Sequence, residues 1–347
     1  MAGLLGKRLA REIQKNPDIE ITFGIVKNDE TLKRFLYGPF EDDMTWITNI
    51  PMYLDEGRAK VREMNELQQK IRFAPADQIN LGKKCDILVD TAAPGSRTKW
   101  DQRYEHFKKP VIIQSGEYPY GRLIAPPLIE ETKTQGNIYR QGDCILSALS
   151  PILAPLKSVA RKIRVNILMQ YDQRLQDYTT NQRINALYLR DDLERRLEGE
   201  LKSLFNEQEI IMENVIQKPG LDYYLATLHL DTNKPISGKD IRQILEERPR
   251  IKIAPDGMTS TYEIDHLLRE EAHALGRDIS PIVLYSSDLN DSQLKKKDIR
   301  IRATIYSKLI AVLPNIDAIR IIARDMEPLT AMRTTDHYAG FNGPMGI

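Results

Sequence analysis

The sequence predicts an α/β protein, with a first domain built on a parallel sheet and then an α+β domain with a mixed or antiparallel sheet. Its 347 residues exceed what one ordinary core supports, which favours two domains. Up to about residue 143, strand-like and helix-like segments alternate, as is typical of parallel crossover units. Beyond that residue the strict alternation is lost, so we expect a different kind of sheet there.

The composition narrows the function classes. Hydrophobic residues (41%) and charged residues (29%) are in the proportions of a soluble globular protein. The 50 Lys and Arg nearly cancel the 49 Asp and Glu, which argues against a nucleic-acid partner. No apolar run is long enough for a transmembrane helix, so we expect no membrane partner. Two cysteines and no histidine in a metal-ligand pattern predict a reducing, cytoplasmic setting and no metal site.

Apolar periodicity predicts the elements of the first domain, residues 1–143. Leu5, Leu9 and Ile13 recur on one helical face directly after a glycine turn. Further elements are a helix at residues 56–71 and strands at residues 19–26, 85–90 and 110–114.

The same patterns predict the rest of the chain. We expect a catalytic or substrate domain over residues 144–313 and a C-terminal helix within residues 314–347 that packs back on the first domain. The predicted helices lie at residues 144–156, 184–205, 237–248, 261–275 and 316–332. The predicted strands lie at residues 163–171, 221–230, 250–254 and 299–305.

A glycine pair at the start of the chain indicates dinucleotide binding. Gly3 and Gly6 form the second half of G-x-G-x-x-G, whose bare backbone lets a pyrophosphate approach a helix N-terminus. This pattern is typical of a Rossmann-type domain, although half of it also occurs at plain helix starts. Lys27, at the end of the next strand, favours the 2′-phosphate of NADP, whereas Asp29 favours NAD. A solvated Lys27 is the alternative.

The glycine turn has no strand before it. We expect either that the start codon lies about eight to ten residues further upstream, the length of a strand and turn, or that the cofactor site has lost an edge.

Cys144 is the candidate nucleophile. It follows Gly142-Asp143 and opens an apolar helix, and a helix N-terminus lowers a thiol pKa by favouring the thiolate. The alternative is a small buried hydrophobe, the role that we assign to Cys85 inside an apolar strand.

Several segments, in order along the chain, resemble archaeal-type glyceraldehyde-3-phosphate dehydrogenases. Residues 3–10 are similar to that family's G-Y-G-T-I-G-K-R-V-A opening, and residues 314–320 to its P-E-N-I-D-A-I-R. The other matching segments are residues 85–90, 114–117, 248–251 and 257–264. The resemblance covers nearly the whole chain, and it is thin between these segments.

The resemblance implies a two-domain fold and a glycolytic reaction in which a cysteine attacks an aldehyde, a nicotinamide takes the hydride and phosphate releases the thioester. It implies NADP or NAD as cofactor, a small-molecule aldehyde substrate and a homotetramer. Cys144 is similar to the family nucleophile. The cofactor residues that it implies, together with those of the glycine turn, are Gly3, Leu4, Leu5, Gly6, Lys27, Asn28, Thr91, Ala92, Pro94 and Gly95.

The sequence departs from the family at the residues that carry out the reaction. Residues 143–148 read D-C-I-L-S-A in place of S-C-N-T-T-G, and Asp143 is expected to raise the pKa of the neighbouring thiol. Residues 221–224 read L-D-Y-Y where the family carries its catalytic histidine, with His229 the nearest downstream. Residues 168–172 lack the family's arginine pair, and the nearest arginine is Arg174. Residues 306–309 read Y-S-K-L where the family has H-Q-E-S before its last helix.

Three readings follow. In the first, the chain is an NAD(P)-dependent dehydrogenase of glyceraldehyde 3-phosphate or a related aldehyde. In the second, it is a catalytically impaired, dinucleotide-binding homologue with a regulatory or interaction role. In the third, it is a related dehydrogenase with another substrate and a different base, Tyr223 or Tyr224.

Overall fold

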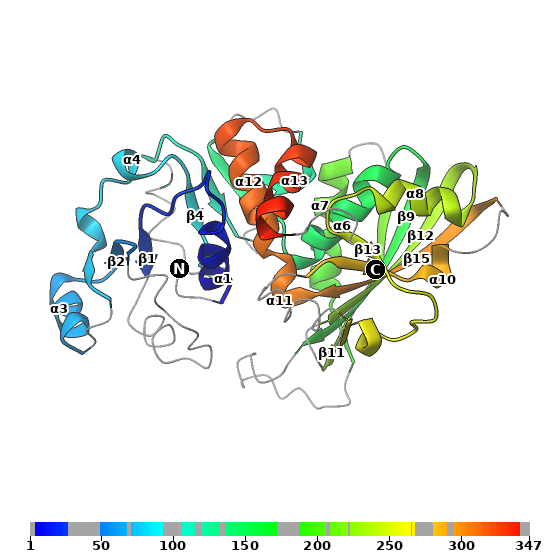
Figure 1. Cartoon of the computed structure of the whole chain (residues 1–347), viewed down its shortest axis with the longest axis horizontal. Helices are drawn as coiled ribbons and strands as arrows, with labels where there is room; N and C mark the ends of the chain where they lie inside the picture. Colours follow the sequence, from blue (N-terminus) through cyan, green and yellow to red (C-terminus); the bar gives the residue numbers. More distant parts are fainter. Residues whose placement is uncertain are drawn as a thin grey trace.

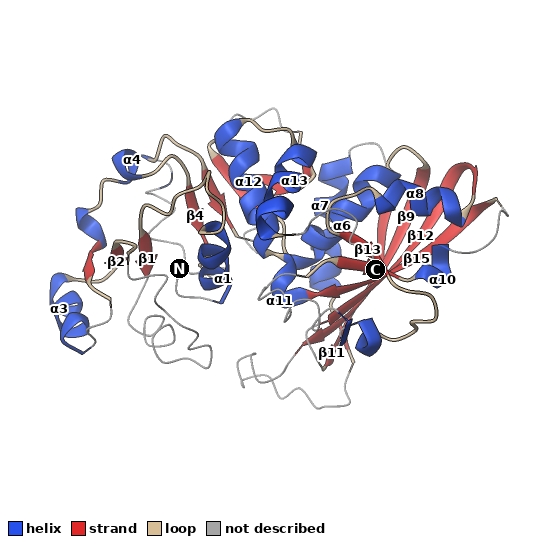
Figure 2. Cartoon of the chain, in the orientation of Figure 1, coloured by secondary structure: helices blue, strands red, loops and turns tan. Residues whose placement is uncertain are grey.

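The computed structural model describes residues 4–26, 49–67, 71–92, 104, 106–114, 120–131, 136–171, 187–205, 209–220, 223–264, 266–267, 280–289 and 295–340. Within these residues the strands form two parallel-type sheets at one end of the molecule and one mixed sheet at the other (Figure 1 and Figure 2). No helix in the described ranges combines the length and apolar character needed to cross a membrane.

The N-terminal part contains the predicted parallel pairing. One sheet joins β1 (Gly24–Val26), β2 (Met52–Leu54) and β3 (Phe73–Pro75), all parallel. The other runs in parallel through β4 (Leu88–Asp90), β5 (Val111–Ile113), β8 (Ile138–Gln141) and β6 (Arg122–Ala125), with β7 (Leu128–Ile129) antiparallel at its edge. The helices of this part are α1 (Leu4–Ile13), α3 (Arg58–Leu67), the short 3-10 turn η2 (Ala76–Gln78) and α4 (Leu81–Lys84).

The C-terminal part contains the predicted mixed sheet, in the strand order β10-β11-β9-β12-β15-β14-β13. Its strands are β9 (Ala160–Tyr171), β10 (Tyr188–Leu189), β11 (Glu209–Pro219), β12 (Tyr223–Ile236), β13 (Ile251–Ile253), β14 (Ile282–Leu284) and β15 (Lys296–Tyr306). The accompanying helices are α6 (Cys144–Leu156), α7 (Asp191–Phe205), α8 (Gly238–Glu246), α10 (Ser286–Leu289) and α11 (Ser307–Ile310).

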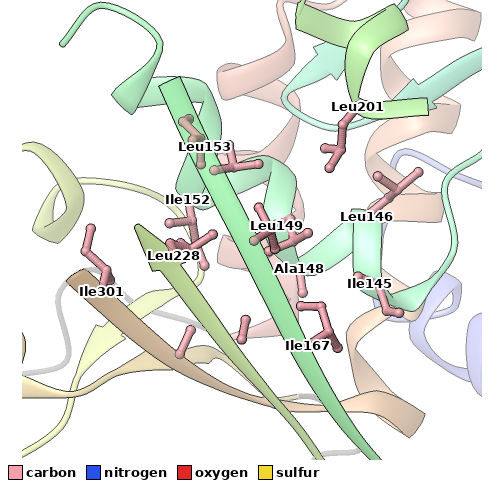
Figure 3. Close-up of a cluster of buried hydrophobic side chains, with 14 of the residues drawn as sticks. Ile145, Leu146, Ala148, Leu149, Ile152, Leu153, Ile167, Leu201, Leu228 and Ile301 are labelled. Carbon is pink, nitrogen blue, oxygen red and sulfur yellow. The ribbon is translucent and has the colours of Figure 1, made fainter. Parts of the chain in front are cut away.

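The main core lies between α6 and one face of the mixed sheet. Ile145, Leu149 and Ile152 of α6 pack over Leu228 of β12 and Ile167 of β9, all essentially buried (Figure 3). Successive side chains of a strand point to opposite faces, so the even-numbered residues of β12 up to position 230 enter this core and the odd-numbered ones face away. This alternation decides which side chains of β12 can reach α6.

A second set of contacts ties the end of the chain to its beginning. Helix α12 (Val312–Arg324) packs against α1, and its fully buried Arg320 forms hydrogen bonds with Asp18 (2.7 Å), Asn16 (2.6 Å) and Thr335 (2.6 Å). The division of the chain into domains at residues 143 and 313 stays a prediction.

Three predicted elements differ from the structure. The single helix predicted at 316–332 is wrong, because Asp325 adopts a left-handed φ of 51° and α13 (Pro328–Ala339) begins at a proline. The strand predicted at 19–26 is limited to β1. The helix predicted at 184–205 begins only at Asp191, so Leu187 lies outside it and is exposed.

Strand β11 has no counterpart among the predicted elements. A β-bulge shifts its pairing with β9 between Met212 and Asn214, so the inward and outward positions change phase in the middle of the strand. Such a shift breaks the alternation by which a half-buried strand is recognised. The helix predicted at 261–275 is described only at residues 261–264 and 266–267, which are helical.

A buried ion cluster joins β13 to the two C-terminal helices. Arg250, in a left-handed conformation (φ 64°), pairs with Asp317 of α12 and Asp336 of α13, each at 2.7 Å. All three side chains are buried. Burial raises the pKa of Asp336 to about 6; the charge of Arg250 opposes this rise and that of Asp317 adds to it.

This cluster predicts a pH-dependent stability. Because the pKa of Asp336 is higher in the folded protein than in the unfolded chain, its contribution is complete at acidic pH and is lost as the pH rises through about 6. The free energy of unfolding should fall between about pH 4.5 and 7.5, by about 2 kcal/mol from this group. Asp336→Asn should remove that fall in urea titrations at both pH values. Asp231→Asn, at an exposed ion pair, should keep it; an unaltered fall in Asp336→Asn contradicts the prediction.

Candidate active site

The candidate site lies at the carboxyl edge of the parallel sheet. Strands β4, β5 and β8 run in the same direction, so the residues that follow them, Thr91 and Ala92, Gln114, and Gly142 to Cys144, meet at one edge. Neighbouring strands are about 4.8 Å apart, which places the ends of β4 and β8 about 10 Å from each other. The predicted nucleophile and the first part of the predicted cofactor loop therefore share this edge.

The turn from β8 into α6 is closely packed. A Cβ on Gly142 would lie 3.0 Å from the Cβ of Leu146 and 3.2 Å from that of Ala125, so only glycine fits without a shift. Asp143 is the N-cap, and its Oδ1 accepts hydrogen bonds from the backbone N–H groups of Ile145 and Leu146, both at 2.9 Å. These contacts make Cys144 the first residue of α6, as the sequence predicts.

The Cys144 thiol is partly buried, and its Sγ lies 3.0 Å from the Oη of Tyr224 on β12. Burial, and then the charge of Asp143, raises the pKa of Cys144 to about 12, although the Tyr224 hydroxyl and the backbone N–H groups of Cys144 and Ile145 oppose the rise. The expectation that the helix N-terminus lowers this pKa is therefore corrected, because removing the thiolate from water outweighs the helix N-terminus. At neutral pH Cys144 is a thiol.

Four charged side chains surround the start of α6. Arg196 of α7 forms an ion pair with the Oδ2 of Asp143. One turn later on α7, the buried Glu200 forms an ion pair with Arg140 of β8, and burial and the charge of Asp143 raise the pKa of Glu200. Two arginines and two carboxylates cancel formally, so this cluster carries no surplus positive charge for a phosphate group.

The sequence contains a signal for this cluster of charges. Glu200 falls within the apolar stripe of α7, beside Leu197, Leu201 and Leu204, all buried. A charged residue inside such a stripe requires a partner, because burying an unpaired carboxylate is costly. Arg196 lies four residues earlier on the same helix face. Only the structure identifies the partners, Arg140 and Asp143.

Some of the predicted cofactor residues are described. Leu4, Leu5 and Gly6 form the first turn of α1, where Gly6 is buried. Thr91 and Ala92 are half-buried, and Asp90 holds them by accepting hydrogen bonds from the Ala92 N–H (2.7 Å) and the Tyr104 hydroxyl (2.6 Å). Ala92 has a small side chain at the carboxyl end of a parallel strand, and its role in binding a dinucleotide stays a prediction. Gly3, Lys27, Asn28, Pro94 and Gly95 lie outside the described residues.

The structure separates the candidate bases. Tyr224 and the core residues of β12 point towards α6, whereas Tyr223 and His229 occupy odd positions that point to the opposite face. The ring of Tyr223 packs against that of Tyr306, with centroids 5.1 Å apart. His229 is thus on the wrong side of the sheet for Cys144, and Tyr224 is the tyrosine that contacts the thiol. Arg174 lies outside the described residues.

Comparison with curated proteins identifies relatives along most of the chain. A glyceraldehyde-3-phosphate dehydrogenase of Saccharolobus islandicus (strain L.S.2.15 / Lassen #1) is 23% identical over 348 residues, covering 97% of this chain and 95% of that protein. One from Hyperthermus butylicus is 24% identical over 92% of this chain and 90% of its own length. None of the protein-family models compared with the chain matches it. The predicted resemblance to the archaeal enzymes is confirmed.

Solved structures share the fold. Aspartate-semialdehyde dehydrogenase with NADP from Candida albicans superposes with a TM-score of 0.58 at 13% identity, over 98% of this chain and 97% of that one. Aspartate-semialdehyde dehydrogenase II from Vibrio cholerae gives 0.57 at 14% identity, over 88% and 99%. These likenesses, with the observed sheets, confirm the predicted fold class, a Rossmann-type parallel domain with an α+β domain.

The charge of Asp143 predicts the effect of Asp143→Asn. Asparagine keeps an oxygen that can cap α6 but removes the negative charge beside the sulfur, so the pKa of Cys144 should fall. We expect alkylation of Cys144 by iodoacetamide, measured by mass spectrometry at about pH 8, to become about tenfold faster, the effect of one pKa unit. Asp240→Asn, which alters the cap of α8, is the matched control. Equal rates in wild type and Asp143→Asn would refute the assignment.

Proposed function

We propose that this divergent relative of archaeal glyceraldehyde-3-phosphate dehydrogenases is an NAD(P)-dependent aldehyde dehydrogenase with Cys144 as its nucleophile. The observation that carries the proposal is the position of Cys144. It opens α6 at the carboxyl edge of a parallel sheet, two strands from Thr91 and Ala92. This is the edge at which open α/β sheets bind their ligands.

The side chains of the site define the chemistry. Once ionised, Cys144 adds through Sγ to the carbonyl carbon of an aldehyde and gives a hemithioacetal alkoxide, which forms the thioester by loss of a hydride from the same carbon. A bound nicotinamide dinucleotide supplies the hydride acceptor that oxidises this adduct to a thioester. Gly3, Gly6, Lys27, Asn28 and the loop at residues 91–95 would hold the dinucleotide.

We propose glyceraldehyde 3-phosphate or a related aldehyde as the substrate, and phosphate as a candidate acyl acceptor. The names of the archaeal relatives support the first. The neutral charge cluster at α6, and the lack of an arginine in residues 168–171, support testing unphosphorylated aldehydes with equal weight. The structural neighbours are named for aspartate semialdehyde, an aldehyde without a phosphate group. From the resemblance to the archaeal enzymes we propose a homotetramer, and from the two unpaired cysteines a cytoplasmic setting.

A second candidate function is dinucleotide binding without turnover, in a regulatory or interaction role. It is favoured by a specific observation, the elevated pKa of Cys144, together with the loss of the family's histidine. A thiol that stays protonated at neutral pH reacts slowly unless something lowers its pKa when the ligands bind.

Turnover separates these two functions. We expect reduction of NADP or NAD with at least one member of a panel of phosphorylated and unphosphorylated aldehydes, assayed with and without inorganic phosphate. Cys144→Ser should lose at least about a hundredfold in kcat, because a serine without a base is a far weaker nucleophile. Cys85→Ser, at a thiol that donates to the carbonyl of Leu81, should retain activity. Full activity in Cys144→Ser would exclude covalent catalysis by this residue.

Cofactor preference tests the binding half of the proposal. NADP should raise the melting temperature more than NAD does, because Lys27 can pair with the 2′-phosphate. In Lys27→Glu the order should reverse, with Lys252→Glu on β13 as a control of equal charge change. Equal shifts with both dinucleotides would contradict the preference for NADP. A shift without turnover on the whole aldehyde panel would favour the second candidate function.

A further inference from the structure

We infer that Tyr224 is a positioning residue for Cys144: from the interior side of the site, its hydroxyl donates a hydrogen bond to the sulfur, orients it and stabilises the thiolate. The inference deepens the proposed function and rests on it only in taking Cys144 as the nucleophile. The pairing brings together two residues that are 80 positions apart in the chain.

The position of Tyr224 is set by the mixed sheet. In β12 it lies between Met169 of β9 and Ile305 of β15, its partners in the antiparallel ladders. It is completely buried in the core beneath α6, and its hydroxyl lies 3.0 Å from Cys144 Sγ. Cys144 as a residue is partly exposed whereas Tyr224 is completely buried, so we take the aldehyde to approach from the exposed side of Cys144. The tyrosine therefore acts through the sulfur and has no contact with the substrate.

The direction of the hydrogen bond follows from the two groups. A phenol is a good donor and keeps its proton at neutral pH, whereas a thiolate can only accept. Tyr224 is therefore a donor to sulfur and not the base that removes its proton. The proton of the thiol leaves through the partly exposed side of Cys144, to solvent. Hydrogen bonds to a charged acceptor are the strong ones, so the contact matters most once the thiolate has formed.

The charged groups that face this site are paired with one another and do not stabilise the thiolate of Cys144. Asp143 directs Oδ1 to two backbone N–H groups and Oδ2 to Arg196, and its charge opposes the thiolate. Arg196 of α7 is held by Asp143, and Glu200 by Arg140 of β8. Besides the backbone N–H groups of Cys144 and Ile145, the described donor that reaches Sγ is therefore Tyr224.

The experiment measures the thiol itself and then turnover. In a Cys85→Ser background, so that a single thiol remains, the rate of alkylation by iodoacetamide is followed from about pH 7 to 11 in wild type, Tyr224→Phe and Tyr223→Phe. Tyr223→Phe removes the same atom from the neighbouring residue on the opposite face of the sheet. We expect Tyr224→Phe to slow alkylation about ten- to a hundredfold at a given pH and to move the profile to higher pH. Tyr223→Phe should leave the profile unchanged.

A second variant keeps the inference testable if Tyr224→Phe is too unstable to study. Site-specific 3-fluorotyrosine at position 224 keeps the ring and makes the hydroxyl a stronger and more acidic donor, so alkylation should become faster at about pH 7, where the phenol keeps its proton. A packing role for Tyr224 would produce no such acceleration. The pH profile of kcat with an accepted aldehyde should shift in the same direction as that of alkylation in each variant.

The outcomes separate the two proposals. Identical alkylation profiles in Tyr224→Phe and Tyr223→Phe, or no effect of fluorination, would overturn the role of Tyr224 whatever the enzyme does. A shifted profile in a protein that oxidises no aldehyde would support the Tyr224–Cys144 interaction while the proposed dehydrogenase function fails.

Discussion

The geometry of the candidate site depends on the carboxylate of Asp143. One of its oxygens caps α6 through two backbone N–H groups, and the other pairs with Arg196 of α7. The same residue stands where the parallel sheet ends and where the helix covering the mixed sheet begins. Because Gly142 has no room for a side chain, the turn has little freedom to place Cys144 elsewhere. A single carboxylate thus fixes the start of the core helix and the position of the sulfur together.

This arrangement has a cost in reactivity. A negative charge beside a buried thiol opposes its ionisation, so the group that positions Cys144 also keeps it protonated. The Tyr224 hydroxyl and the two backbone N–H groups act in the opposite direction from the interior and from the helix N-terminus. The balance between these contributions decides between a working dehydrogenase and a protein that only binds a dinucleotide. Each of these contributions depends on distances to one sulfur atom. A ligand that changes those distances on binding would therefore change the pKa of Cys144.

The charge pattern around the site also bears on the substrate. Arg196 and Arg140 are both occupied by carboxylates, Asp143 and Glu200. A phosphate group that displaced the buried Arg140–Glu200 pair would leave a buried carboxylate without its partner, which costs about 3–5 kcal/mol. The cluster is therefore better suited to holding α7 against α6 than to binding an anion.

Much of this could be predicted from the sequence alone, because it depends on neighbours in the chain. An aspartate before an apolar run determined the start of α6, alternating patterns determined the parallel sheet, and short motifs in order determined the relationship to the archaeal enzymes. The sequence singled out Tyr223 and Tyr224, but only the tertiary structure decided which of them contacts Cys144. That choice depends on which face of β12 lies under α6, and on a register between strands far apart in the chain. Packing likewise decided the bulge in β11, the buried partners of Glu200 and the elevated pKa of Cys144. Local periodicity does not indicate which side chains meet across the core.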